Sequence, residues 1–67
     1  PAKDYAIIYS STNQKLFITD LYGKKVSSQI GQFSSHYEIN TKSLSAGIYF
    51  INLIENNQRT VHRLIVN

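Results

Sequence analysis

The sequence lacks cysteine, methionine and tryptophan, and it has only one proline and three glycines in 67 residues. Without cysteine, neither disulfides nor a thiolate metal site can stabilise the fold, so stability must come from packing alone. Hydrophobic residues make up 42% of the chain, and this content together with the low proline and glycine content argues against disorder. A chain of this length can build only one thin core, so we expect a single domain.

Long hydrophobic runs are also missing, since no apolar stretch approaches the roughly 18 residues that a membrane-spanning helix needs. The first four residues, Pro-Ala-Lys-Asp, do not form a charged segment followed by an apolar one, as a signal peptide would. We therefore expect no membrane insertion, and export would require another segment to direct the first crossing.

Positive charge is in slight excess, with a net charge of +3. Proteins that bind nucleic acid usually cluster their basic residues or carry a recognisable motif. This sequence has neither, because the cations are spread along the chain and only two of them are adjacent: Lys3, Lys15, Lys24, Lys25, Lys42, Arg59 and Arg63. We expect no nucleic-acid partner.

Catalytic motifs are absent as well. No serine lies in a Gly-x-Ser-x-Gly motif, and no glycine-rich phosphate loop occurs. A metal site or a catalytic base would have to come from two histidines and four acidic residues: His36, His62, Asp4, Asp20, Glu38 and Glu55. These residues follow no ligand spacing, so the sequence predicts a protein that is not an enzyme and that needs no cofactor.

Segments rich in β-branched and aromatic residues recur along the chain, and short polar clusters separate them. This pattern predicts an all-β fold, a small antiparallel Ig-like β-sandwich of about six or seven strands paired mainly by local hairpins. The predicted strands span residues 5–10, 15–20, 25–30, 35–40, 47–54 and 59–66, with turns at 11–14 and 55–58. We expect 25–30 to return beside 15–20 as an edge strand, and the nearly continuous apolar run 47–54 to be the core strand.

Two short motifs have clear structural interpretations. Asp20 and Gly23 occupy the first and fourth positions of a predicted type I turn, where the aspartate can accept hydrogen bonds from backbone amides and glycine tolerates positive φ. Gly47 is expected to permit a backbone angle or a close approach where the chain enters the core strand. Leu44 and Tyr49 are expected to fill the core.

Three pieces of the sequence resemble a known family: Asp20-Leu21-Tyr22-Gly23-Lys24-Lys25-Val26, Leu44-Ser45-Ala46-Gly47-Ile48-Tyr49-Phe50, and the terminal Arg63-Leu64-Ile65-Val66-Asn67. Their order and spacing are similar to those of the type A C-terminal sorting domain of the type IX (Por) secretion system of Bacteroidota. Pro1-Ala2 resembles the end of the Pro-Asn-Pro-Ala that often opens such domains. The family often closes with lysine, whereas this chain keeps positive charge before the apolar residues and ends in Asn67.

The resemblance implies a secretion address spanning residues 1–67, expected to be a fragment of a larger secreted protein. In that family the cargo enters the periplasm through a separate signal peptide, and the type IX translocon and shuttle proteins carry it across the outer membrane to the cell surface or the medium. A cysteine-type signal peptidase then removes the domain, often attaching the cargo to anionic lipopolysaccharide.

The best candidates for translocon recognition are the terminal residues Arg63, Leu64, Ile65, Val66 and Asn67, because an exposed terminal strand can add to the edge of a partner's sheet. The alternative is that this strand only completes its own sheet. Lys24 and Lys25, beside the turn, are further candidates, with simple solvation as the alternative. Asp20, Gly23, Leu44, Gly47 and Tyr49 are assigned to structure.

Two other functions stay open at this point. Five tyrosines and three phenylalanines could form a sugar-stacking platform in a carbohydrate-binding or adhesive module of a secreted enzyme. Most of these aromatics fall within predicted strands, where we expect aromatic side chains to be core. A generic Ig-like spacer would have no partner at all. Nothing in the sequence indicates an oligomeric state.

Overall fold

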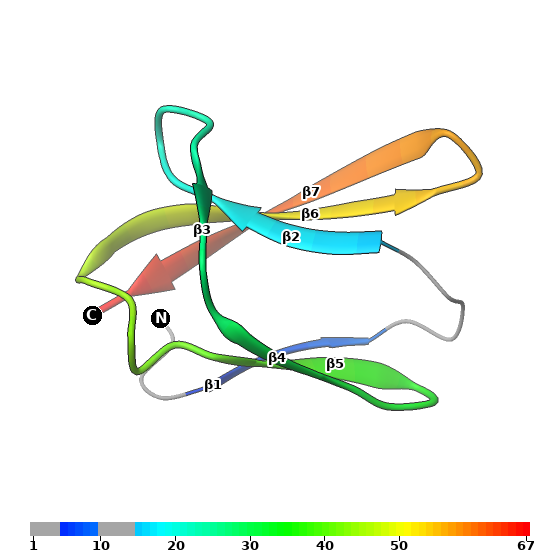
Figure 1. Cartoon of the computed structure of the whole chain (residues 1–67), viewed down its shortest axis with the longest axis horizontal. Coiled ribbons are helices and arrows are strands. Elements are labelled where there is room, and N and C mark those ends of the chain that lie inside the picture. The colour runs from blue at the N-terminus through cyan, green and yellow to red at the C-terminus, as the bar shows by residue number, and fades with distance from the viewer. Residues whose placement is uncertain (1–4, 10–14) are drawn as a thin grey trace.

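The fold is a two-layer sandwich of antiparallel sheets (Figure 1). The computed structural model describes residues 5–9 and 15–67. The small sheet has the order β1-β5-β4 and the large sheet the order β3-β2-β6-β7. The bounds are β1 (Tyr5–Tyr9), β2 (Lys15–Thr19), β3 (Lys25–Val26), β4 (Gln29–Gln32), β5 (His36–Asn40), β6 (Gly47–Glu55) and β7 (Gln58–Val66). The predicted all-β sandwich of six or seven strands is confirmed, while Ser10 and the predicted turn at 11–14 lie outside the described residues.

The core lies between the two sheets and follows the alternation expected of strands with one buried face. Tyr37 and Ile39 of β5 point inward, while His36 and Glu38 point outward, as the sequence predicts. The large sheet contributes the other buried hydrophobic side chains of the described chain, namely Ile18, Tyr49, Ile51, Leu53, Leu64 and Val66. Nothing in residues 5–9 or 15–67 forms a helix of the length and apolarity needed to cross a membrane.

Strand β6 is the core strand that the sequence predicts. It lies between β2 and β7 in the large sheet. Three successive residues, Ile51, Asn52 and Leu53, are buried. Because successive side chains of a strand point to opposite faces, the sheet is covered on both faces at this position.

The predicted strand 25–30 is divided between the two sheets, which corrects one expectation. Only Lys25 and Val26 pair with β2. The chain then crosses to the small sheet, where Gln29–Gln32 pairs with β5. At the crossing, the hydroxyl of Ser28 donates a hydrogen bond of 2.6 Å to the carbonyl of Asn40, which fixes the chain to the second sheet. Both β3 and β4 are edge strands, so the expected edge position is correct.

This crossover gives the sandwich one closed side and one open side. The segment from β3 to β4 connects the two sheets along one side (Figure 1). On the other side the edge strands are β1 and β7. The pairing of β1 with β5 and of β2 with β6 is long-range, whereas β2–β3, β4–β5 and β6–β7 are local hairpins.

Candidate functional site

Strand β7 is a nine-residue edge strand whose pairing is with β6. The two strands are joined by a two-residue turn at Asn56 and Asn57, with φ angles of 51° and 64°. Positive φ at both central residues is what a type I′ hairpin turn requires, and asparagine tolerates it better than most residues. The polar turn predicted at 55–58 therefore fixes the register of the whole terminal strand.

The register determines which backbone groups of β7 face away from β6. A two-residue hairpin turn makes its flanking residues, Glu55 and Gln58, a hydrogen-bonded pair. Hydrogen-bonded and non-hydrogen-bonded pairs then alternate along an antiparallel ladder. Counting from the turn, the non-hydrogen-bonded positions on β7 are residues 59, 61, 63 and 65. The N–H and C=O groups of these four residues form the free edge, while those of Leu64 and Val66 serve the pairing with β6.

The side chains of the terminal candidate residues alternate between buried and exposed, in step with the backbone groups. Leu64 and Val66 are buried, with 6% and 4% of their surface exposed, and they belong to the core. Arg63, Ile65 and Asn67 are exposed. Arg63 and Ile65 therefore combine a free backbone edge with an accessible side chain, whereas the side chains of Leu64 and Val66 are covered in the folded domain.

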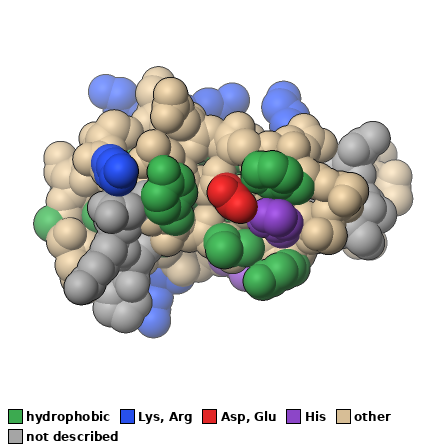
Figure 2. All heavy atoms as spheres, turned by 90° about the horizontal axis from the view of Figure 1, so that it is seen from below, with side chains coloured by type: hydrophobic (Ala, Val, Ile, Leu, Met, Phe, Trp, Pro, Cys, Tyr) green, Lys and Arg blue, Asp and Glu red, His purple; other side chains and the backbone are tan. Residues whose placement is uncertain are grey.

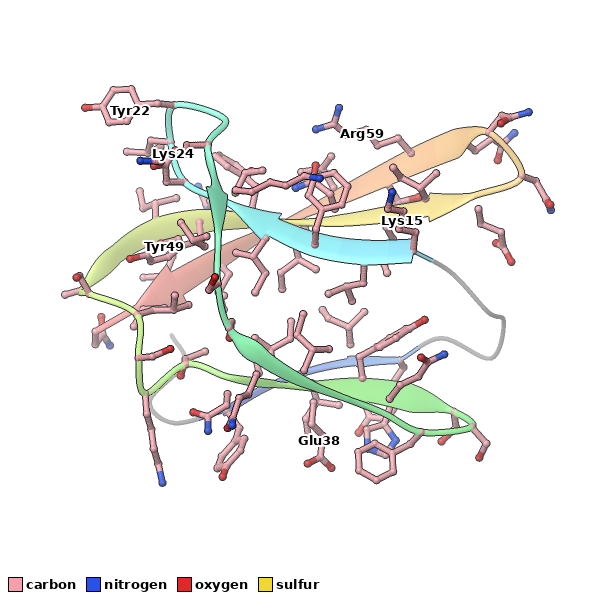
Figure 3. All side chains as sticks on the ribbon, in the orientation of Figure 1. Lys15, Tyr22, Lys24, Glu38, Tyr49 and Arg59 are labelled. Atoms are coloured by element: carbon pink, nitrogen blue, oxygen red, sulfur yellow. The ribbon has the colours of Figure 1, made fainter. Side chains whose placement is uncertain are left out.

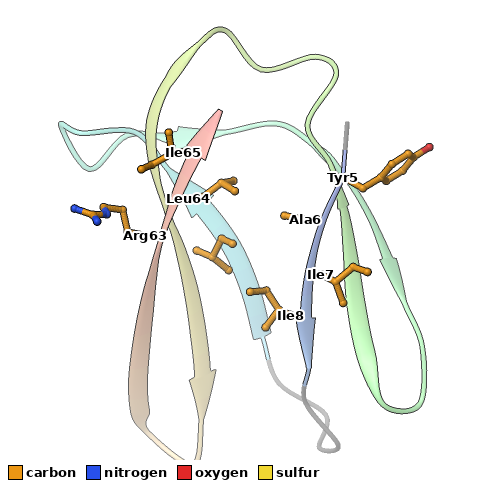
Figure 4. A pocket seen from close by; sticks show the side chains of 8 residues that line it. Tyr5, Ala6, Ile7, Ile8, Arg63, Leu64 and Ile65 are labelled. Carbon is orange, nitrogen blue, oxygen red and sulfur yellow. The ribbon is translucent and has the colours of Figure 1, made fainter. Parts of the chain in front are cut away.

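A groove separates β7 from β1 on the open side of the sandwich (Figure 4). Its volume is about 420 Å³. Figure 4 shows Leu64 and Ala6 facing the space between the two sheets, whereas Arg63 points away from β1. The lining comes from three strands, through Tyr5, Ala6, Ile7, Ile8, Ile51, Arg63, Leu64 and Ile65. The free edge of β7 thus lies beside an apolar opening into the core.

The turn between β2 and β3 has the hydrogen bonds that its sequence predicts. Oδ1 of Asp20 accepts from the amides of Tyr22 and Lys24 at 2.9 and 3.0 Å. The amide of Gly23 donates to the carbonyl of Asp20 at 3.1 Å, and the amide of Asp20 donates to the carbonyl of Lys24 at 2.9 Å. Gly23 has a φ of +82°, the left-handed conformation that ends a three-residue hairpin loop.

The segment that enters β6 is held by a side chain of the same segment. The hydroxyl of Tyr49 donates a hydrogen bond of 2.7 Å to the carbonyl of Ser45, much as in the tyrosine corner of Ig-like sandwiches. Leu44 packs against the core, as predicted, and its amide donates to the carbonyl of Thr41. Gly47 has a φ of +157°, and the nearest atom to a Cβ at this position, in the Tyr49 ring, would be 4.0 Å away. The backbone angle, not a close approach, explains this glycine.

The two groups of recognition candidates lie at opposite edges of the large sheet. Lys24 lies in the turn and Lys25 on β3, at one edge, and Arg63 lies on β7, at the other. Lys25 is exposed, and its Nζ lies 4.7 Å from the centroid of the Phe17 ring. Sequence reasoning missed a further pair, Asn52 and Arg59, since nothing in the linear pattern indicates that a polar residue within an apolar run is buried.

Comparison with known protein families identifies the family of this chain. The family described as "Secretion system C-terminal sorting domain" matches residues 1–67. The chain belongs to this family. No curated protein and no solved structure gives a significant match.

Membership in this family identifies the general function of the domain. The sorting domain is a type IX C-terminal secretion signal. A domain of this kind implies interaction with the type IX secretion machinery and secretion through the outer membrane. The sorting-domain family is not an enzyme family. Within residues 5–9 and 15–67, no three histidine or acidic side chains are placed to hold a metal ion together.

The sorting domain also has an aromatic surface on the outer face of the small sheet, and Figure 2 shows hydrophobic side chains around one acidic and one histidine side chain there. His36 stacks on Phe33 with 4.7 Å between ring centroids, and its Nε2 lies 3.0 Å from Oε2 of Glu38. The expectation that aromatics within strands are core holds for Tyr37 and Tyr49 but not for Tyr5 and Tyr9 of β1, which are 54% and 79% exposed. Outside the strands, Tyr22 and Phe33 are also more than half exposed. In a sandwich, alternate residues of each strand face solvent.

Proposed function

We propose that the type IX machinery reads this domain through the free edge of β7. The observation that supports the proposal is the position of residues 59–66 at a sheet edge, with outward N–H groups at Arg63 and Ile65. An edge of this kind can accept a strand from a partner, whose main chain supplies affinity and whose pockets select alternate side chains. Arg63 and Ile65 are the side chains that such pockets would contact.

We further propose the order of events that the resemblance to the type A sorting domains implies. A separate signal peptide takes the cargo into the periplasm, and the translocon and its shuttle proteins move it across the outer membrane. A cysteine-type signal peptidase then removes the domain. The cargo is attached to anionic lipopolysaccharide at the cell surface or is released. In this scheme residues 1–67 are the terminal part of a larger protein, and the domain is a ligand and a substrate, never a catalyst.

The basic test is a secretion assay in a cell with a type IX system. A reporter that carries a signal peptide and this domain is expected in the medium or at the surface, and in the periplasm when the translocon is deleted. Deleting residues 63–67 is expected to retain the reporter in the periplasm. Since this deletion also removes two core side chains, Leu64 and Val66, it must be accompanied by a variant that keeps the fold. Export that does not depend on the translocon contradicts the proposal.

A carbohydrate-binding module is the second candidate, and the exposed aromatic surface is the observation that favours it. Tyr5 and Tyr9 lie on β1 with 54% and 79% of their surface exposed. Chemical-shift titration with soluble polysaccharide fragments tests this function. Saturable shifts confined to Tyr5, Tyr9 and Phe33, lost in a Tyr9→Ala variant, would support sugar binding; no shifts in the millimolar range would exclude it.

A further inference from the structure

The strand register gathers cations that are far apart in the sequence onto the outer face of the large sheet. Directly opposed residues of an antiparallel pair share a face. Lys15 is opposite Ile54, and Ile54 is opposite Arg59. These three side chains therefore form one row across β2, β6 and β7. In Figure 3, Lys15 and Arg59 lie on the side of the large sheet that faces away from the small sheet.

A second cationic row lies four residues along each of these strands. Thr19 of β2 is opposite both Lys25 of β3 and Phe50 of β6, and Phe50 is opposite Arg63 of β7. This row thus has a cation at each end. Four of the seven cations of the chain, two in each row, frame the outer face of the large sheet.

Arg59 is held in place by Asn52, which lies in the row between the two cationic rows. Asn52, at the centre of that row, has no exposed surface. Its Oδ1 accepts from Nε of Arg59 at 3.0 Å and from Nη2 at 2.6 Å. Nη1 of Arg59 makes neither of these contacts. Fixing a guanidinium in this way lowers the conformational entropy that it loses on binding an anion.

Acidic side chains do not face this surface in the described part of the chain. Glu38 projects from the small sheet, on the opposite side of the sandwich (Figure 3). Asp20 accepts hydrogen bonds from two turn amides. Glu55 follows Ile54 on β6, so the two side chains start from opposite faces of the sheet. Among residues 5–9 and 15–67, the charged side chains on the outer face of the large sheet are therefore all cationic.

The centre of the same face is apolar. Phe17, Phe50 and Ile54 are half-buried there, and Val61 is 49% exposed. The opposed pair Ile48 and Ile65 continues the apolar surface beyond Arg63. An apolar centre with charged groups around it is the usual composition of a protein–protein interface. A site for a highly charged polymer would need the cations alone.

We propose that this outer face is a second docking surface, for an acidic patch on a protein of the type IX outer-membrane complex. The partner surface would place carboxylates opposite Lys15, Lys25, Arg59 and Arg63, and apolar side chains opposite Val61. Electrostatic complementarity of this kind accelerates encounter and fixes orientation. The face would orient the domain while the edge of β7 pairs. This surface shares Arg63 with the β7 edge but extends across the sheet to β2 and β3, so Lys15 on β2 tests it without altering β7.

The test measures binding of the purified domain to detergent-solubilised type IX outer-membrane complex on a sensor surface. The variant Lys15→Glu reverses one charge of the face. Lys42→Glu is the matched control, because it makes the same change in net charge but Lys42 lies near Tyr5 of the small sheet, 5.6 Å from its ring centroid. We expect Lys15→Glu to weaken binding about three- to tenfold at low salt and Lys42→Glu to leave it within about twofold. Raising the salt from about 50 to about 300 mM should reduce the difference.

Three outcomes would overturn this inference. One is that Lys15→Glu and Lys42→Glu weaken binding equally, which would show that only net charge matters. Another is that dextran sulfate binds the domain as tightly as the complex does and displaces it, which would identify the face as a general polyanion site. If Lys15→Glu binds like the wild type while β7 variants fail to be secreted, the docking surface is refuted and the edge proposal stands.

Discussion

The guanidinium of Arg59 donates two hydrogen bonds to a single atom, Oδ1 of Asn52. Nδ2 of Asn52 in turn lies 3.3 Å from Oγ1 of Thr19 and 3.2 Å from the carbonyl of Phe50. A fully buried amide is thus satisfied at both ends, which is what a buried polar group requires. This cluster connects β2, β6 and β7 on the face of the large sheet opposite the core.

The Asn52 cluster predicts a specific order of stabilities. Asn52→Asp keeps an acceptor for Arg59 but places a buried carboxylate near the carbonyl of Phe50, so we expect a loss of about 2–4 kcal/mol in the free energy of unfolding. Asn52→Leu removes the polar group and leaves Thr19 without its amide donor, with an expected loss of about 1–3 kcal/mol. Urea unfolding of both variants checks the order. A neutral or stabilising Asn52→Asp would refute this description of the cluster.

The Tyr49 hydroxyl provides a cleaner measurement of one hydrogen bond. Tyr49→Phe removes only the donor to the Ser45 carbonyl, and we expect a loss of about 0.5–1.5 kcal/mol. Tyr22→Phe is the control, because Tyr22 is 92% exposed and its variant should unfold at the wild-type denaturant midpoint. Equal midpoints for the two variants would mean that the bond adds nothing to stability.

Gly47 and Gly31 differ in the physical reason for having no side chain. Gly47→Val should destabilise the domain by about 1–3 kcal/mol, since φ of +157° is a conformation that residues with a Cβ rarely adopt. A Cβ at Gly31 would meet the Phe33 ring at 3.2 Å, and an exposed ring can move, so Gly31→Ala should cost less than about 1 kcal/mol. Thermal unfolding compares them, and an unaltered melting temperature for Gly47→Val contradicts the backbone argument.

The terminal strand should respond to alanine according to which way each side chain points. Leu64 is buried in the core, so Leu64→Ala should cost about 2–4 kcal/mol. Ile65 is 36% exposed, and Ile65→Ala should cost about 1 kcal/mol or less. Chemical denaturation measures both. Similar losses at the two positions would contradict the burial of Leu64 and the exposure of Ile65 on opposite faces of the terminal strand.

Local patterns predicted most of the strands, because each of them depends on neighbours in the sequence. The alternation in residues 36–39 fixed which side chains are buried, and the Asp20 to Gly23 spacing fixed a turn. The division of residues 25–30 between two sheets was not predicted. The crossing is held by a hydrogen bond from Ser28 to the Asn40 carbonyl, twelve residues away, and a contact at that separation leaves no local pattern. Two adjacent serines have no periodicity that signals a change of sheet.

The candidate surfaces show the same limit more clearly. The terminal strand was predicted as a recognition element, but its free edge follows from the Asn56-Asn57 turn conformation, which sequence alone left open. Lys15 and Arg59 are forty-four positions apart and become neighbours across β6 only through the pairing of three strands. The cations are scattered in the sequence, so the linear pattern did not predict that four of them lie on the outer face of the large sheet.

The free edge of β7 is tested most directly by two substitutions at one residue. Ile65→Pro removes the outward N–H and leaves the hydrogen bonds from Leu64 and Val66 to β6 in place, as proline on an edge strand can. Ile65→Ala shortens the same side chain but keeps the N–H. Both variants are first checked for a cooperative unfolding transition and are then fused to the secreted reporter. We predict that the Ile65→Ala reporter is still exported, at a reduced level because its shorter side chain fills less of the partner's pocket, and that the folded Ile65→Pro reporter accumulates in the periplasm; equal export of the two would contradict edge pairing.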